Sequence, residues 1–241
     1  HGFAANTPAA DSEHVYCFFG KTGVFAFDHA GNQLWQADVG DKTHGWGTSA
    51  SPVLYRDLVF INASVESESL VALDRKTGKE QWRAQNIKEA WNTPVVLKNI
   101  NGKPELVIAT QGSIQAFDPD SGQQLWTCAT DIGWYMAPSV VAHDGIVYAI
   151  GGRQGGALAV RTGGRGDVTA THRLWKINKG SNVSSPVYHA GKLYWAHESI
   201  GVVYGIMLGM EGDGFSYLEL EEYAEGIRDE LISLEPASRV E

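Results

Sequence analysis

Tryptophan recurs along this chain at an almost constant interval, and that interval sets the size of a repeating unit. Four of the eight tryptophans stand 47, 44 and 49 residues apart, namely Trp35, Trp82, Trp126 and Trp175. Proline recurs in phase with them, at Pro8, Pro52, Pro94, Pro138 and Pro186. The spacing predicts a structural repeat of about 45 residues, with starts near residues 8, 52, 94, 138 and 186.

An Asp and a Gly precede each of the first three tryptophans, and these pairs indicate tight turns. The pairs are Asp28 with Gly31, Asp74 with Gly78, and Asp118 with Gly122. Glycine adopts positive φ without steric cost, and an Asp carboxylate accepts hydrogen bonds from a turn, so each pair predicts a reversal between two strands. Each Trp stands four residues after its Gly, on the returning strand.

The apolar runs within each repeat are short and rich in β-branched residues, as at 58–63, 106–109 and 146–150. They are bounded by Gly, Asp and Asn and lack the i, i+3, i+4 spacing of helical repeats. We therefore expect an all-β fold, a partial β-propeller of four-stranded antiparallel blades. Five repeat starts with four complete copies predict about 4.5 blades.

Two copies follow the string Ala-x-Asp-x-x-Thr/Ser-Gly-x-x-x-Trp, from Ala72 to Trp82 and from Ala116 to Trp126. This string resembles the tryptophan-docking motif of the PQQ-like repeat, which is shared by quinoprotein alcohol dehydrogenases and the outer-membrane assembly lipoprotein BamB. The resemblance spans residues 1–204 and implies an extracytoplasmic protein, in the periplasm or at the cell surface. It also implies that each Trp packs on a neighbouring blade, with Trp35, Trp82, Trp126, Trp175, Asp28, Asp74, Asp118, Gly31, Gly78 and Gly122 as the structural docking residues.

The repeating sequence pattern ends after residue 204. Ser216 and Glu219 form a capping box, and apolar residues at 220, 223, 224, 227 and 231 share one helical face, so residues 217–232 are predicted to be an amphipathic α-helix. The segment 202–241 resembles part of the periplasmic porter region of RND efflux transporters. We therefore expect a second domain at 205–241, joined within an unfinished repeat as a fusion or a chimera. Likewise, we expect that the chain begins inside a repeat.

The net charge of −9 lies almost entirely in this tail, where residues 211–241 contain ten acids and two arginines. The rest of the chain is close to neutral, so nothing predicts binding to nucleic acid. No run of 18 apolar residues predicts a membrane span.

A quinoprotein resemblance implies pyrroloquinoline quinone beneath an adjacent Cys–Cys pair, Ca²⁺ held by carboxylates, and an Asp base. The two cysteines, Cys17 and Cys128, are not adjacent. Residues 118–122 open like a calcium loop but stand in phase with the other blade turns. We therefore predict no catalytic, cofactor-binding or metal-binding residues, and no cofactor.

The second set of tryptophans, Trp46, Trp91 and Trp134, precedes the prolines, where loops lead into each blade. Arg153, Arg161 and Arg165 lie in a glycine-rich repeat. Together, the three tryptophans and these three arginines are the candidate ligand or partner surface. The sequence thus favours a non-catalytic binding or scaffold module for a protein, glycan or small ligand. The alternatives are a fragment of a PQQ-dependent dehydrogenase and a transporter-associated periplasmic protein.

Overall fold

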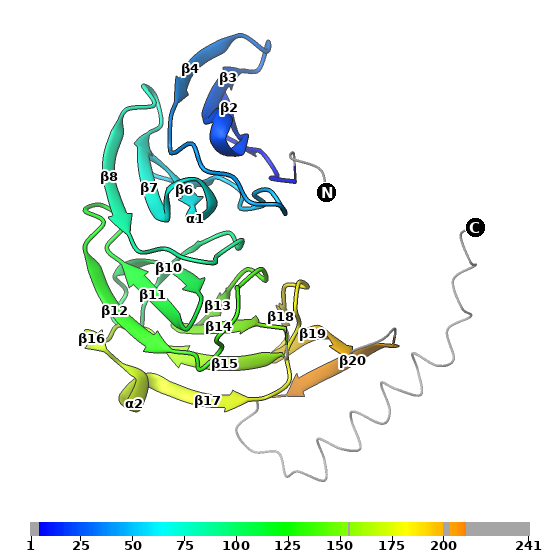
Figure 1. Cartoon of the computed structure of the whole chain (residues 1–241). Helices are drawn as coiled ribbons and strands as arrows, with labels where there is room; N and C mark the ends of the chain where they lie inside the picture. Colours follow the sequence, from blue (N-terminus) through cyan, green and yellow to red (C-terminus); the bar gives the residue numbers. More distant parts are fainter. Residues whose placement is uncertain (1–4, 154, 200–202, 211–241) are drawn as a thin grey trace.

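Five β-sheets follow one another along an arc in the computed structural model, which describes residues 5–153, 155–199 and 203–210 (Figure 1). The first sheet contains β1 (Ala9–Ala10), β2 (His14–Phe18), β3 (Val24–Asp28) and β4 (Gln33–Ala37). The second contains β5 (Val53–Tyr55), β6 (Leu58–Ala63), β7 (Ser69–Asp74) and β8 (Glu80–Gln85). The third contains β9 (Val95–Lys98), β10 (Pro104–Thr110), β11 (Ser113–Phe117) and β12 (Gln124–Ala129), with β16 (Gly166–Asp167) added parallel to β12.

The fourth sheet contains β13 (Val141–His143), β14 (Ile146–Gly151), β15 (Gly156–Arg161) and β17 (Arg173–Ile177). The fifth contains β18 (Val187–His189), β19 (Lys192–Ser199) and β20 (Val203–Met210). Three single-turn helices lie in the connections: η1 (Gly20–Thr22), α1 (Ser64–Ser67) and α2 (Thr169–His172).

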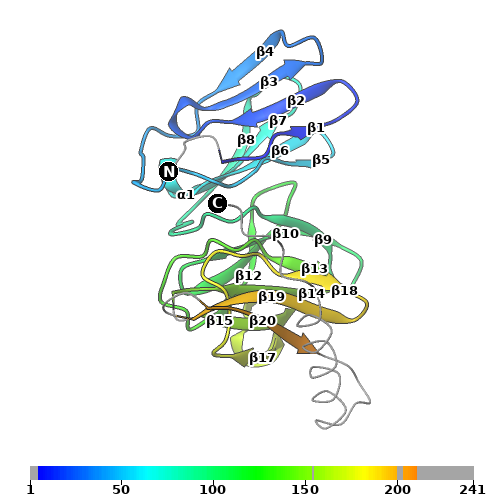
Figure 2. The same cartoon turned by 90° about the vertical axis from the view of Figure 1, so that its right-hand side faces the viewer.

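Sequential strands are hydrogen-bonded neighbours in every sheet, and all of these pairs are antiparallel. The last strand of each complete blade, β4, β8, β12 or β17, lies on the outer side of the arc (Figure 1). Seen from the open side, the sheets follow one another as blades (Figure 2). The prediction of an all-β propeller with four-stranded antiparallel blades is confirmed.

A β-bulge interrupts the pairing of the third and fourth strands at the same place in the first four sheets. In each case the register shifts directly after an Ala that pairs with a Trp. The residue before the Trp has no partner on the third strand and forms the bulge. The pairs are Ala26 with Trp35, Ala72 with Trp82, Ala116 with Trp126, and Ala159 with Trp175. The 45-residue repeat in the sequence is therefore a repeat of backbone geometry as well.

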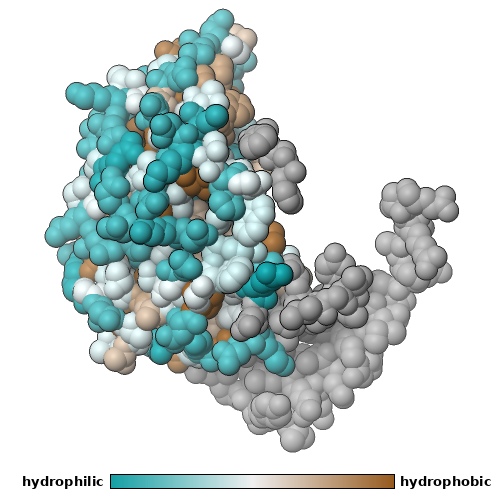
Figure 3. Space-filling model, viewed as in Figure 1, coloured by the Kyte–Doolittle hydropathy of each residue, from teal (hydrophilic) through white to brown (hydrophobic). Residues whose placement is uncertain are grey.

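The hydrophobic core lies between consecutive blades. One cluster joins Tyr16 and Trp35 of the first blade to Ile61 and Val71 of the second, and three further clusters join the second to the third, the third to the fourth and the fourth to the fifth. The middle strands are buried on both faces, which explains their continuous apolar runs. On the face seen in Figure 1 most residues are hydrophilic and the hydrophobic ones are scattered (Figure 3).

A chain of hydroxyl groups links the blades around the arc. The backbone N–H of Thr7 donates to Ser51 Oγ, that of Ser51 to Thr93 Oγ1, that of Thr93 to Ser139 Oγ, and that of Ser139 to Ser185 Oγ, each at 3.0 Å. Each residue adjoins one of the phased prolines. The loops that lead into the blades are therefore held in register by one repeated contact.

The fifth sheet extends beyond the domain boundary predicted at residue 204. Strand β20 pairs with β19 from Val203 to Met210, so the boundary falls inside a strand of this sheet. The predicted helix at 217–232 lies outside the described residues, and the likeness to RND transporters is not shown. No helix within the described ranges is long and apolar enough to cross a membrane.

Candidate functional site

The tryptophans of the fourth strands reach toward the next blade. Trp35 Nε1 donates to the carbonyl oxygen of Arg75 at 3.1 Å, and its ring lies against Gly78, where a Cβ atom would stand 2.5 Å from Trp35 Cε3. Trp82 repeats the contact on the third blade, with Nε1 3.0 Å from the carbonyl oxygen of Pro119. In both cases the acceptor directly follows the Asp of the next blade's turn.

The Asp residues of these turns organise the backbone that receives the tryptophan. Asp74 Oδ1 accepts from the backbone N–H groups of residues 76 and 77 and from Thr77 Oγ1. Asp118 Oδ1 accepts from the corresponding groups of residues 120 and 121 and from Ser121 Oγ, and Asp28 caps the shorter first turn. Gly31, Gly78 and Gly122 close the three turns at φ between 70° and 88°.

Trp126 makes a different contact, because the fourth blade lacks the Asp turn. Its Nε1 donates to Glu105 Oε2 at 2.8 Å, and Glu105 is fully buried. Asn99 Nδ2 donates to the other carboxylate oxygen at 2.8 Å, and Arg165 Nη1 lies 3.9 Å from it. A buried carboxylate thus replaces the missing turn carbonyl. Trp175, the last of the series, is half-buried beside Tyr148.

The second set of tryptophans meets in one group of rings, which we name the aromatic cluster: His44, Trp46, Trp91, Trp134 and Tyr135. The Trp46 ring centroid lies 4.7 Å from that of Tyr135 and 5.6 Å from that of Trp91. The Trp134 centroid lies 5.8 Å from that of Tyr135, and the His44 centroid 5.0 Å from that of Trp91. Three loops that lead into the second, third and fourth blades therefore converge through their aromatic side chains.

Hydrogen bonds between blades hold these loops in place. Trp91 Nε1 donates to the carbonyl oxygen of Gly47 at 2.8 Å, and the Trp91 backbone N–H donates to that of Met136 at 2.9 Å. Tyr135 Oη donates to Asn182 Oδ1 at 2.9 Å, which adds the loop leading into the fifth blade. The cluster is thus tied to its scaffold on several sides.

The aromatic cluster combines a buried anchor with exposed rings. Trp91 is 8% exposed, whereas Trp46 is 46% and Trp134 is 43% exposed. Large aromatic side chains on a rigid support are the residues that most often dominate protein interfaces. The structure therefore brings the three predicted tryptophans together. It adds His44 and also Tyr135, which stands three residues before Pro138 as Trp91 stands three residues before Pro94.

The three predicted arginines lie at different places along the fourth blade, and their role as a binding surface stays a prediction. Arg153 lies before β15 and places its guanidinium 5.9 Å from the Trp134 ring centroid. Arg161 ends β15. Arg165 lies four residues further along the chain, close to Glu105. An extended strand of this length spans about 17 Å, so residues near in sequence are carried to opposite ends of the blade.

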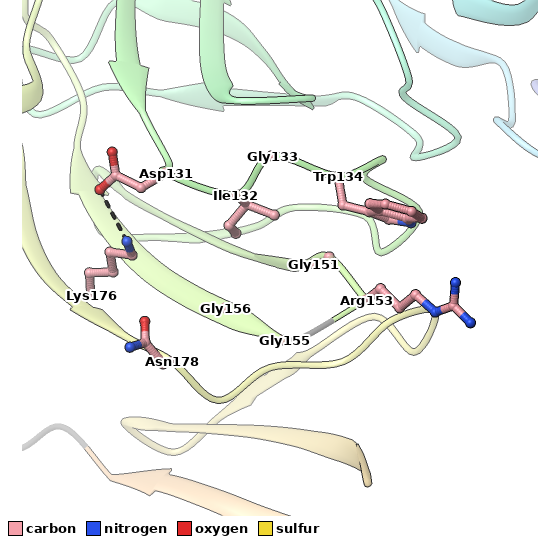
Figure 4. Close-up of a pocket in the computed structure, with 11 residues that line it drawn as sticks. Asp131, Ile132, Gly133, Trp134, Gly151, Arg153, Gly155, Gly156, Lys176 and Asn178 are labelled. Atoms are coloured by element: carbon pink, nitrogen blue, oxygen red, sulfur yellow. Dashed lines mark hydrogen bonds and ion pairs between the residues drawn. The ribbon is translucent and has the colours of Figure 1, made fainter. Parts of the chain in front are cut away.

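Trp134 and Arg153 also line a cavity of about 590 Å³ between the loop that leads into the fourth blade and the strands of that blade, here named the Trp134 cavity. Figure 4 shows Trp134 and Arg153 at one end and Asp131 with Lys176 at the other. Lys176 Nζ lies 3.1 Å from Asp131 Oδ2, and these ion-pair contacts hold the pKa of Asp131 below its ordinary value. Arg173 also pairs with Asp131 Oδ2, at 2.8 Å, so two cations share that oxygen.

A second cavity, of about 530 Å³, lies between the first two blades and is named the Glu66 cavity. It is lined by η1, by the loop at 43–48 and by α1. Glu66 is 2% exposed, and no described residue donates to its Oε2 atom. Burial raises the pKa of Glu66 to about 7, although a hydrogen bond from Thr48 opposes the rise. No sequence signal marked this site, because a single Glu between two strands is typical of an ordinary turn.

The described residues do not supply the donor set of a quinone and calcium centre. They contain no group of three or more His, Cys, Asp or Glu side chains placed to hold a metal ion. Cys17 lies on β2 of the first blade and Cys128 on β12 of the third, both as free thiols. Burial raises the pKa of each thiol, which disfavours the reactive thiolate.

Comparison with known proteins agrees with this geometry. A family model described as outer membrane protein assembly factor BamB matches residues 1–107. Quinoprotein alcohol dehydrogenase PedH of Pseudomonas putida is 31% identical over 165 residues, which are 64% of this chain and 25% of that relative. The repeats form a β-propeller and are similar to the repeats of these proteins. The chain spans about a quarter of the length of PedH.

Solved structures show the same fold in two functional contexts. BamB from Moraxella catarrhalis superposes with a TM-score of 0.51 at 15% identity, over 80% of this chain and 68% of that one. Quinohemoprotein alcohol dehydrogenase from Comamonas testosteroni superposes with a TM-score of 0.54 at 15% identity, over 80% of this chain and 40% of that one. At these identities the likeness concerns the β-propeller fold alone.

Proposed function

We propose that this PQQ-like propeller is a non-catalytic, extracytoplasmic binding module that holds a segment of a partner protein at its aromatic cluster. The observation that carries the proposal is the half-exposed pair Trp46 and Trp134, which pack on the buried ring of Trp91 and on Tyr135. Rigid, amphipathic rings give contact area at little cost in conformational entropy. The match to the BamB family model over residues 1–107 supports a role beside outer-membrane proteins.

A photo-crosslinking amino acid at position 134 tests this proposal in bacterial envelope extracts. We expect protease-sensitive adducts of discrete size, and we expect Trp46→Ala in the same protein to reduce them at least fivefold. Leu34 is a matched control position, since it is 47% exposed but lies on β4, outside the aromatic cluster. Equal labelling at positions 34 and 134, or adducts that resist protease, would contradict a protein-binding role.

The 31% identity to PedH favours a second candidate, a fragment of a quinone-dependent alcohol dehydrogenase. We regard it as the weaker one, because the described residues lack an adjacent cysteine pair and a carboxylate group fit for a metal. Purified protein mixed with pyrroloquinoline quinone, Ca²⁺ and a primary alcohol is expected to reduce no artificial electron acceptor. Steady turnover that rises with added quinone would establish the dehydrogenase instead.

A further inference from the structure

The Glu66 carboxyl group is a buried acid without a countercharge. It lies on α1 at the wall of the Glu66 cavity and is 2% exposed. Lys21 lines the same cavity, yet no ion pair joins it to Glu66 among the described residues. Burying a carboxyl with an unpaired oxygen costs free energy, so a group that donates to Oε2 would be stabilised there.

The backbone keeps this acid in place. The carbonyl oxygen of Glu66 accepts from the N–H of Lys42 at 3.2 Å. Gly40 approaches that carbonyl so closely that a Cβ atom would stand 2.4 Å from the oxygen, and a Cβ at Gly20 would stand 3.1 Å from Glu66 Oε1. Two blades therefore close around Glu66 through glycine contacts. These contacts place η1 and the loop after β4 directly against Glu66.

We propose that the Glu66 cavity binds a primary ammonium group, the side chain of a lysine from the partner protein. An ammonium has three donors, and the cavity wall offers it acceptors from the Glu66 carboxylate, Thr43 and Thr48. A calcium ion would need six to eight oxygen ligands and usually several carboxylates. Within the described part of the chain only Glu66 offers a carboxylate among the lining residues.

The cavity adjoins the aromatic cluster, so this inference rests on the proposed function and extends it. His44 lines the cavity and also lies 5.1 Å, between ring centroids, from Trp46. A peptide held on the exposed rings could therefore place a lysine side chain in the cavity beside them. The aliphatic stem of that lysine would cover the apolar atoms of Phe19 and Val65.

Binding should depend on pH in a defined direction. The ionisable groups around the cavity are Lys21 on η1, His44 on the loop at 43–48 and Glu66 on α1. Because burial raises the pKa of Glu66 to about 7, a proton and an ammonium compete for the same carboxylate. The affinity for an ammonium should thus rise between pH 6 and pH 8.

The test uses Nα-acetyl-lysine methylamide as the probe and its norleucine analogue, which lacks the ammonium, as the matched control. Chemical-shift changes of the full chain at pH 8 are expected to saturate with the lysine probe at millimolar concentration. Glu66→Gln should weaken this binding at least tenfold, and Thr48→Val should weaken it by a smaller factor. The norleucine probe should bind weakly to all three proteins.

Equal binding of both probes, or unchanged lysine binding by Glu66→Gln, would overturn the proposal. Saturable binding of Ca²⁺ or Na⁺ that displaces the lysine probe and is lost in Glu66→Gln would overturn it in favour of a metal site. Circular dichroism and thermal melting establish that each variant is folded. If Glu66→Gln does not fold, the lysine-probe affinity of Thr48→Val tests the proposal instead. Trp46→Ala separates the two proposals, because Trp46 does not line the Glu66 cavity: the variant should reduce partner crosslinking from position 134 while leaving lysine-probe affinity within about twofold.

Discussion

The indole ring of Trp35 lies directly on Gly78 of the next blade, where any side chain would collide with it. A Cβ atom at Gly78 would stand 2.5 Å from Trp35 Cε3, and Gly78 has a φ of 70°. The Asp–Gly turn is therefore both a reversal of the chain and a flat surface that receives a neighbouring ring. The glycine is required for the packing between blades as well as for its own backbone conformation.

This contact predicts an asymmetry between two equivalent glycines. Gly31 closes the matching turn of the first blade with a φ of 88°, and nothing lies within 4 Å of a Cβ built there. Both Gly31→Ala and Gly78→Ala carry the cost of a left-handed backbone, about 1 kcal/mol. Only Gly78→Ala also displaces an indole, which should add about 1–3 kcal/mol. Urea unfolding should show this difference, and equal losses would mean that Trp35 moves aside freely.

The buried and exposed tryptophans should differ sharply in their contribution to stability. Trp126 is 1% exposed and donates to the buried Glu105, so Trp126→Ala should lower the free energy of unfolding by about 3–5 kcal/mol. Trp46→Ala, at a ring that is 46% exposed, should lower it by less than about 1 kcal/mol. Denaturant titration of both variants is the measurement. Similar losses for both would show that the aromatic cluster is a second core.

The hydroxyl chain between the blades predicts that loss of one hydroxyl weakens the contact. Thr93 Oγ1 accepts the backbone N–H of Ser51 at 3.0 Å, and Thr93→Val removes that acceptor while keeping the shape of the side chain. We expect a loss of about 1–3 kcal/mol, because a partly buried N–H is left unpaired. Thr93→Ser keeps the hydroxyl and should lose less than half as much. Equal losses for the Val and Ser variants would contradict a stabilising role for the Thr93 hydroxyl.

Glu66 should make the stability of the protein fall as the pH rises. Its pKa is about 7 in the folded protein and 4.5 in the ordinary case, so between these values the folded state binds the proton more tightly than the unfolded state. The free energy of unfolding should decrease between about pH 4.5 and pH 7, by up to about 3 kcal/mol, and stay low above pH 7. Stability falls with rising pH, rather than increasing, because folding raises the pKa of this acid.

Glu66→Gln should remove this slope, because the amide stays neutral at every pH. The variant should match the wild type near pH 5 and exceed its melting temperature at pH 8. Melting curves at pH 5, 6, 7 and 8 measure both effects. A wild-type profile that rises through this range, or a Gln variant with the same slope, would show that Glu66 ionises without hindrance.

Much of the fold could be read from spacing, because each blade needs the same local chemistry. The Asp–Gly turn, the returning Trp and the apolar runs before the Asp are short-range features, so their repetition predicted antiparallel four-stranded blades. The convergence of Trp46, Trp91 and Trp134 followed from the same phase, since equivalent loops of successive blades meet on one face. The sequence alone determined the repeat and the residues that occupy equivalent places in it.

Only the tertiary structure decided which non-repeating residues meet. Arg153 and Arg161 are eight positions apart in the sequence, yet β15 carries them to different ends of a blade. Glu105 receives the Trp126 indole because the fourth blade lacks an Asp turn, and Glu66 is buried because α1 and η1 close over it from two blades. Burial and unpaired charge depend on contacts between distant segments, which no local pattern encodes.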